Sequence, residues 1–261
     1  MKSSYYKYFA ALLLFGSNGI VASNINLPSY EIVLLRLLLG SLFLITVFTV
    51  SRQRFTFYRN KHTCLYLFIS ASAMGASWML LYEAYQQVGI SIASLAYYCG
   101  PVIVMILSPF LFRETLTWPK IAGFLTVLAG MCLVNLQALD EGKTIWGLFC
   151  GLMSAFMYAL MVTANKKAKP ESGLENSLLQ LVIGSFIVVA FVSMQKNFVL
   201  SLTTIDWIPV LVLGLLNTGI GCYLYFSSIT DLPVQTVAIC GYLEPLSAVV
   251  FSVLFLHEVL L

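Results

Sequence analysis

Charged residues are scarce in this chain. Only 10% of its 261 residues are Asp, Glu, Lys or Arg, whereas 60% are hydrophobic and the mean hydropathy is +0.91. This leaves too little polar surface to cover a water-soluble globule of this length. The composition predicts a protein whose solvent is a lipid bilayer, and the net charge of +3 does not indicate a nucleic-acid partner.

Groups for metal or covalent chemistry are also scarce. The two histidines, His62 and His257, stand at opposite ends of the hydrophobic part of the chain, and the six cysteines lack metal-type spacing. No G-x-S-x-G, H-E-x-x-H, Walker or dinucleotide motif occurs. The sequence therefore predicts neither an enzyme nor a metal or cofactor site, and any ATP-driven mechanism would need another subunit.

Long apolar runs are what the chain does have. A helix needs roughly 17–25 apolar residues to cross the hydrocarbon layer. Nine such runs occur, near residues 8–23, 31–50, 63–83, 91–112, 119–137, 145–164, 175–194, 208–229 and 234–256. Because the connecting segments are short, we expect a single all-α integral membrane unit with nine visible spans.

An internal repeat organises these runs. Residues 34–41 return as residues 178–185 with five of eight positions identical, a shift of 144. The same shift aligns residues 101–116 with residues 245–260. We therefore predict two repeats, residues 1–140 and 141–261, as in transporter folds whose substrate site lies at the repeat interface.

The basic residues predict the topology. With the N-terminus in the cytoplasm, eleven Lys and Arg residues fall in inner segments and two in outer loops. Five spans in the first repeat then make the second repeat inverted. A cleaved signal peptide ending near Ser23 is the alternative for the first span, but the repeat needs this segment as its first helix.

The second repeat is shorter than the first. After Glu114 the first copy continues through another span, whereas the sequence stops at Leu261 just after Glu258. We expect a ten-helix fold and interpret the missing tenth helix as a truncation of the sequence. A natural early end, with lipid or a partner covering the exposed flank, is the alternative.

Ionisable residues inside spans are the main functional candidates, because each costs on the order of 2.5–3.5 kcal/mol on insertion scales. Glu244 lies mid-span and precedes Pro245, which interrupts the helix ladder. It is either a substrate or proton site or a structural carboxyl that stabilises the kink. Its repeat counterpart, Gly100, has no carboxylate.

Arg36 and Glu83 lie near the outer ends of the second and third spans. They are candidates for an outer-gate ion pair or for binding a zwitterion. The alternative is that Arg36 snorkels to the interface while Glu83 is solvated. Gln180 occupies the position of Arg36 in the second repeat, so the charge is not repeated.

Aromatic side chains cluster near these groups. The candidate substrate-binding residues are Glu244, Tyr242, Tyr97, Tyr98, Trp78, Tyr82, Asn18 and Asn217. Phenol and indole rings can bind organic substrates by stacking and hydrogen bonding. As alternatives, membrane aromatics mark the interfaces, and the two asparagines connect helices. Gly147 and Gly151 form a G-x-x-x-G motif that we assign to packing within the bundle, with a homodimer contact as the alternative.

The paired motifs resemble a known family. An apolar helix with a mid-span proline ends in Glu-x-Leu twice, from Pro101 to residues 114–116 and from Pro245 to residues 258–260. These features, with Arg36 and the segment 81–85, are similar to the EamA domains of the drug/metabolite transporter superfamily. The resemblance implies a basket of ten helices in two inverted five-helix repeats, with a central cavity and alternating access. It does not fix the substrate.

We therefore interpret the chain as a multi-pass permease of a bacterial-type inner membrane, with its N-terminus in the cytoplasm. We expect it to export small organic metabolites such as amino acids, with proton coupling through Glu244. The alternative is a non-transporting scaffold or assembly subunit that uses the incomplete bundle as a docking groove.

Overall fold

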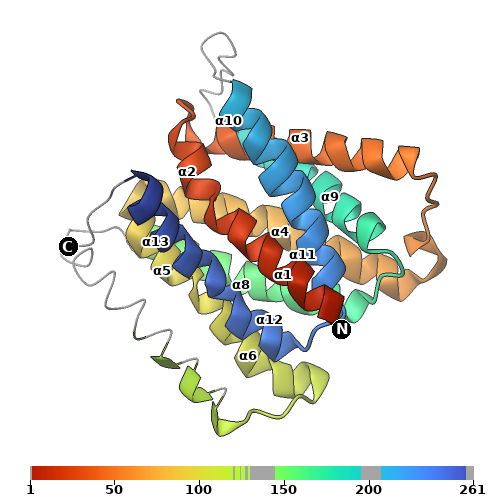
Figure 1. Ribbon diagram of the computed structural model, residues 1–261. Helices are drawn as coiled ribbons and strands as arrows, with labels where there is room; N and C mark the ends of the chain where they lie inside the picture. Colours follow the sequence, from red (N-terminus) through yellow and green to blue (C-terminus); the bar gives the residue numbers. More distant parts are fainter. Residues whose placement is uncertain are drawn as a thin grey trace.

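The computed structural model describes residues 2–119, 121–123, 125, 126, 129, 145–194 and 207–256. All regular structure among them is helical (Figure 1). Seven helical stretches are long and apolar enough to cross a membrane: Tyr30–Val50, Lys61–Val88, Ile92–Phe112, Ile145–Ala168, Gly173–Ser193, Trp207–Ile229 and Val234–Phe255. The all-α membrane prediction is confirmed for these seven spans.

The helices have the following bounds: α1 Lys2–Gly16, α2 Asn18–Ser23, α3 Ser29–Val50, α4 Lys61–Val88, α5 Ile90–Tyr97, α6 Cys99–Phe112, α8 Ile145–Ala168, α9 Gly173–Ser193, α10 Trp207–Leu211, the π-helix η4 Val212–Ile220, α11 Gly221–Ile229, α12 Val234–Gly241 and α13 Leu243–Leu256. The predicted first span corresponds to α1 and α2, which are interrupted at Ser17. The predicted span 119–137 lies mostly outside the described residues, as do His257 and Glu258. Nine spans therefore stay a prediction.

Helix bounds in the two halves correspond at the shift found in the sequence. Adding 144 to α3, residues 29–50, gives 173–194, and α9 covers Gly173–Ser193. The same addition moves α5 and α6, residues 90–112, onto 234–256, the extent of α12 and α13. Even the break between the paired helices recurs, at Tyr98 and at Tyr242.

Residues separated by this shift also touch each other. The Ser41 and Ser185 hydroxyl oxygens lie 3.0 Å apart where α3 packs on α9. Tyr242 donates its phenol proton to the Tyr98 carbonyl oxygen at 2.8 Å. These two contacts tie equivalent positions of the two halves together in the bundle interior.

The longest helix contact joins α4 and α8, which run antiparallel. Ser77 Oγ donates to the Ser154 carbonyl at 2.9 Å, and Ser154 Oγ donates back to the Ser77 carbonyl at 2.7 Å. Near the same pair, Gly151 of the predicted G-x-x-x-G motif has no room for a Cβ, which would lie 2.8 Å from Ala96 Cβ. Gly151 thus packs inside the bundle, as the sequence interpretation expected.

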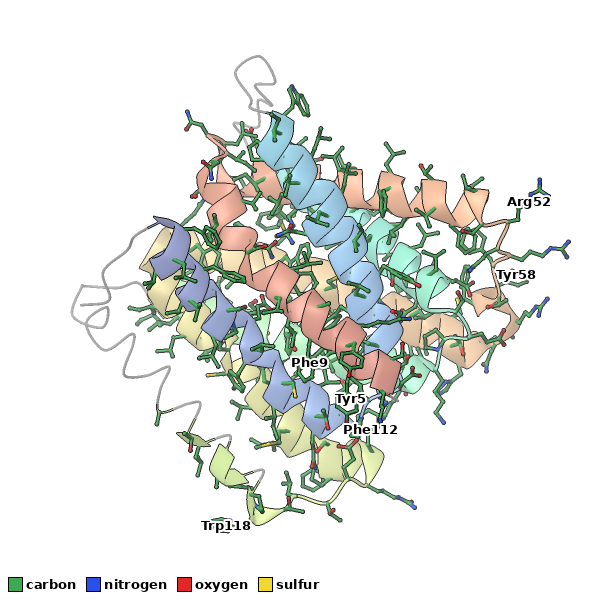
Figure 2. All side chains as sticks on the ribbon, in the orientation of Figure 1. Tyr5, Phe9, Arg52, Tyr58, Phe112 and Trp118 are labelled. Carbon is green, nitrogen blue, oxygen red and sulfur yellow. The ribbon has the colours of Figure 1, made fainter. Side chains whose placement is uncertain are left out.

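Large apolar side chains cover much of the outer surface. Phe110 is 81% exposed and Phe186 70% exposed. Such side chains are stable on a surface that faces lipid. At the end of the bundle where α3 leads into α4, Figure 2 shows the Arg52 and Tyr58 side chains projecting from the connecting segment.

Candidate functional site

Two interrupted helices, α5–α6 and α12–α13, meet in the interior of the bundle. Pro101 and Pro245 are each the third residue of α6 and α13. A proline has no N–H to offer the carbonyl four residues earlier, so the ladder from α5 or α12 does not continue through it. Tyr242, which is 1% exposed and donates to the Tyr98 carbonyl, holds the two interruptions against each other.

Glu244 follows directly after the second interruption. It is half-buried in the first turn of α13, which packs against α1 (Figure 1). A Cβ on Gly16 of α1 would lie 2.9 Å from the Glu244 carbonyl oxygen, so only glycine permits this approach. The Glu244 carboxylate forms no hydrogen bond or ion pair with the described residues, although it interacts electrostatically with Arg36.

Tyrosines surround this carboxylate. Glu244 acts electrostatically on Tyr97, Tyr98 and Tyr158. The Tyr97 ring meets the Tyr158 ring edge-on, with centroids 5.6 Å apart. The structure therefore brings Glu244, Tyr97, Tyr98 and Tyr242 into one region of the bundle, and their role in substrate binding stays a prediction.

Three further tyrosines belong to this region and were not among the predicted site residues. Tyr158 and Tyr225 have hydroxyl oxygens 3.3 Å apart, and the Tyr8 ring lies 5.6 Å from the Tyr225 ring. Tyr8 donates to the Val237 carbonyl at 2.7 Å. These residues come from α1, α8 and α11, so only the fold, and no local sequence pattern, could have grouped them.

Arg36 lies at a second polar point. Its Nε donates to Thr218 Oγ1 at 2.9 Å, and its guanidinium carbon lies 4.7 Å from the centre of the Trp78 ring. Thr218 belongs to the π-helix η4, a type of distortion that occurs often at functional sites. At 7% exposure, the Arg36 side chain is buried among protein residues, which argues against the snorkelling alternative.

Glu83 lies apart from Arg36. In the described part of the chain the two residues form no ion pair. Glu83 accepts instead from the Gln87 amide at 3.1 Å. Its neighbour Tyr82 meets Tyr85 edge-on at 5.3 Å. An Arg36–Glu83 gate pair thus stays a prediction for some other conformation of the protein.

Asn18 and Asn217 are brought together. The Asn217 amide nitrogen lies 2.9 Å from the Leu14 carbonyl oxygen, 2.9 Å from Ser17 Oγ and 3.0 Å from Asn18 Oδ1. All three acceptors flank the interruption between α1 and α2. This geometry matches the alternative in which the asparagines connect helices.

Charged side chains form hydrogen bonds with the backbone at the end that the basic residues predict to face inward. The two carboxylate oxygens of Glu114 accept from the Val234 and Gln235 amides at 2.7 and 3.0 Å. They cap α12, whose N-cap residue, Pro233, provides no capping side chain. From α8, Lys166 Nζ donates to the Thr230 carbonyl at 2.5 Å and the Leu232 carbonyl at 2.6 Å.

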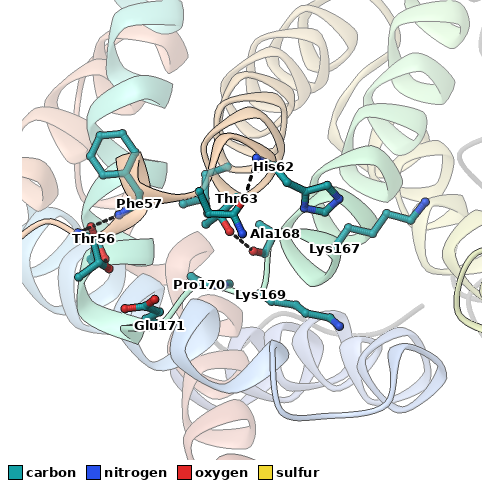
Figure 3. Close-up of a pocket in the computed structure, with 12 residues that line it drawn as sticks. Thr56, Phe57, His62, Thr63, Lys167, Ala168, Lys169, Pro170 and Glu171 are labelled. Atoms are coloured by element: carbon teal, nitrogen blue, oxygen red, sulfur yellow. Dashed lines mark hydrogen bonds between the residues drawn. The ribbon is translucent and has the colours of Figure 1, made fainter.

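A separate cavity of about 310 Å³ lies between the α3–α4 connection and the end of α8 (Figure 3). Its lining is Thr56, Phe57, Asn60, His62, Thr63, Leu67, Lys167, Ala168, Lys169, Pro170, Glu171 and Glu175. None of the predicted site residues lines it. Glu175 is committed to structure here, since it accepts from the Thr56 and Phe57 amides and from the Thr56 hydroxyl.

No metal site accompanies these groups in the described ranges, where no three His, Cys, Asp or Glu side chains lie close enough to share an ion. The groups gathered at these two points are phenols, an indole, one guanidinium and one carboxylate. Together with the apolar spans, they define a multi-pass helical membrane protein with a polar and aromatic centre. Such a centre can bind an organic molecule by charge, stacking and hydrogen bonding.

Comparison with known proteins identifies the family of this membrane protein. The EamA-like transporter family matches residues 3–136 and again residues 145–261. The chain belongs to this family, whose members in the drug/metabolite transporter superfamily are transporters and not enzymes.

Relatives agree with this assignment. The uncharacterized transporter YxxF of Bacillus subtilis (strain 168) is 27% identical over 256 residues, 95% of this chain and 80% of the relative. The threonine/homoserine exporter RhtA of Escherichia coli (strain K12) is 27% identical over 227 residues, 87% of this chain and 73% of that protein. One solved crystal structure superposes with a TM-score of 0.81 at 17% identity, covering 99% of this chain and 90% of that one, which supports the fold.

Proposed function

We propose that this protein exports amino acids or closely related metabolites across a bacterial inner membrane by alternating access. The similarity to an exporter of threonine and homoserine supports the substrate class. The observation that carries the proposal is the Glu244 carboxylate, which lies where two interrupted helices meet and has no hydrogen-bond partner among the described residues. A charge placed this way is available to a substrate ammonium group or to a proton.

We also propose that the fold consists of two inverted repeats, residues 1–140 and 141–261. Three observations support this arrangement: the helix bounds that correspond at a shift of 144, the direct contacts between shifted residues, and the double match to one family. Alternating access in inverted repeats exchanges the conformations of the two halves around a central site. The meeting point of the two interrupted helices is the natural position for that site.

The proposed orientation places the N-terminus in the cytoplasm. It rests on the excess of Lys and Arg in the segments that would face inward. Arg52, Arg54, Arg59 and Lys61 are all exposed at the end of the bundle where α3 ends and α4 begins. An exporter in this orientation takes its substrate from the cytoplasmic end.

The test is a thermal-stability screen of the purified protein against amino acids, nucleobases, sugars and cationic drugs at several pH values. A ligand that binds only the folded state stabilises it by about 2.7 kcal/mol at a hundredfold excess over its dissociation constant. We expect amino acids to raise the unfolding temperature. We also expect proton-coupled flux in vesicles to be lost in Glu244→Gln, whose side chain keeps its shape but cannot ionise.

The matched control is Glu171→Gln, because Glu171 is exposed on the connection between α8 and α9. This variant should keep both ligand stabilisation and flux. Unchanged pH-dependent flux in Glu244→Gln would exclude proton coupling through this residue. Absence of stabilisation by every compound, together with co-purification of a stoichiometric partner helix, would favour a scaffold instead.

A further inference from the structure

Arg36 is fixed from two sides. Its Nε atom donates to Thr218 Oγ1, and the face of its guanidinium rests on the Trp78 ring. The Thr218 hydroxyl in turn donates to the Leu213 carbonyl at 2.8 Å. Thr218 Oγ1 is therefore oriented to accept a hydrogen bond from Arg36. The planar guanidinium has little rotational freedom as a result.

The remaining donors of Arg36 have no partner among the described residues. A guanidinium has five N–H groups in a fixed fork, and the bond to Thr218 uses one of them. The two terminal nitrogens form no hydrogen bond or ion pair with any residue in the described ranges. They also do not count among the fully enclosed side-chain atoms without a partner, as Glu31 Oε2 does. The terminal edge of Arg36 therefore borders accessible space.

A cation held at this depth needs an anionic partner. An ionised side chain buried within a membrane span is costly unless a counter-charge compensates it. Glu244 is the carboxylate that interacts electrostatically with Arg36, yet the two groups are not in contact. Opposite charges that interact without direct contact can each bind one end of a ligand that carries both signs.

We propose that Arg36 binds the carboxylate of a zwitterionic amino acid substrate, positioned by Thr218 and Trp78, while Glu244 faces the substrate's ammonium group. This assignment rests on the proposed transport function and names its substrate class. The geometry suits it, because the two terminal nitrogens of an arginine can donate in parallel to the two oxygens of one carboxylate. Thr218 and Trp78 act through Arg36 and are positioning residues.

The test compares three ligands on the purified full chain. The first is the amino acid that stabilises the protein most, the second its methyl ester, and the third its decarboxylated amine. All three carry an ammonium group, but only the first carries a carboxylate. We expect the ester and the amine to bind roughly 10- to 100-fold more weakly, as expected for the loss of charge-assisted hydrogen bonds.

Variants locate the effect at Arg36. In Arg36→Lys, which keeps the charge but loses the fork, the preference for the acid over the ester should collapse. Thr218→Val should reduce that preference several-fold, and Thr218→Ser should restore it because the hydroxyl returns. Arg59→Lys, at an exposed arginine of the α3–α4 connection, should leave the preference unchanged. A merely structural role of Arg36 would weaken acid and ester equally.

The outcomes separate this inference from the proposed function. Equal binding of acid and ester by the unmodified protein, or an unchanged preference in Arg36→Lys, overturns the carboxylate assignment but leaves a transporter. Stabilisation by a sugar or a cationic drug alone also overturns the assignment. If no compound binds, the proposed function fails and the inference fails with it.

Discussion

Positions 36 and 180 are equivalent in the two halves, but their surroundings differ. Each is the eighth residue of its helix, α3 or α9, and each is polar and almost fully buried. Arg36 uses one donor on Thr218, and its terminal nitrogens bond to no other residue in the described ranges. Gln180 accepts from Ser70 Oγ at 3.2 Å and lies with its amide nitrogen 3.5 Å from Asn176 Oδ1.

The Gln180 side belongs to a closed network. Asn165 and Asn176 exchange hydrogen bonds of 2.9 and 3.1 Å, and Asn176 also donates to the Phe226 carbonyl at 3.0 Å. All of these side chains are fully buried. The comparison teaches that polarity inside a membrane helix does not by itself indicate function. What distinguishes a binding residue is hydrogen-bonding capacity that the fold leaves unused.

The largest effect should come from Gln180→Arg, which gives both halves the same charge. The new guanidinium would enter a network that is already satisfied and has no carboxylate in it, so we expect a loss on the order of 3 kcal/mol in the free energy of unfolding. A denaturing-detergent titration followed by circular dichroism measures this loss. A variant as stable as the parent chain would show that the network can admit a charge.

The reverse change, Arg36→Gln, should act on binding rather than on folding. It removes donors that no described residue uses, so the free energy of unfolding should change by about 1 kcal/mol or less. The affinity for the stabilising amino acid should fall roughly 10- to 100-fold. Titration calorimetry and unfolding on the same preparation test both halves of this expectation, and a large loss of stability with intact affinity would contradict it.

Asn176→Leu should damage the closed network with a moderate effect. The change removes the partner of Asn165 and leaves the Phe226 carbonyl with one acceptor site unused. We expect about 1–2 kcal/mol of destabilisation and an unchanged preference for the acid over its methyl ester. Loss of that preference would mean that the α9 side of the bundle also shapes the binding site.

The smallest effect should come from Ser41→Ala, at the contact between the two halves. Ser41 and Ser185 share one hydrogen bond, and such bonds between membrane helices contribute about 0.6 kcal/mol on average. Ser185→Ala should cost a similar amount, and the double variant little more than either single one. Fully additive losses in this double-mutant cycle would contradict a shared contact.

The sequence predicted much of the helical framework, because span length and hydrophobicity are local properties. The shift of 144, read from two short segments, also places α9 opposite α3 and the Tyr242 interruption opposite Tyr98. Pro101 and Pro245 marked both interrupted helices. The break at Ser17 has no proline to mark it, and η4 contains none, although Pro209 precedes it by three residues.

The residues of the candidate site were named from the sequence, but their contacts were not. Glu244 and the three tyrosines could be grouped from the sequence. Tyr97 and Tyr98 shortly precede Pro101, and Tyr242 and Glu244 shortly precede Pro245. The partners of Arg36, in contrast, come from α4 and η4, and Thr218 is 182 residues away. Such pairing depends on how helices pack and on which donors remain unused, and neither is encoded in the spacing of a single span.

The hydrogen bonds at the proposed inner end bear on the rate of the proposed transport. Glu114 accepts from two amides of α12, and Lys166 lies within hydrogen-bonding distance of three carbonyl oxygens at the end of α11. Any opening of this end must break these charge-assisted bonds, so we expect that step to carry an activation enthalpy. We therefore expect the proposed transport to depend steeply on temperature, and replacing Lys166 to flatten its Arrhenius slope.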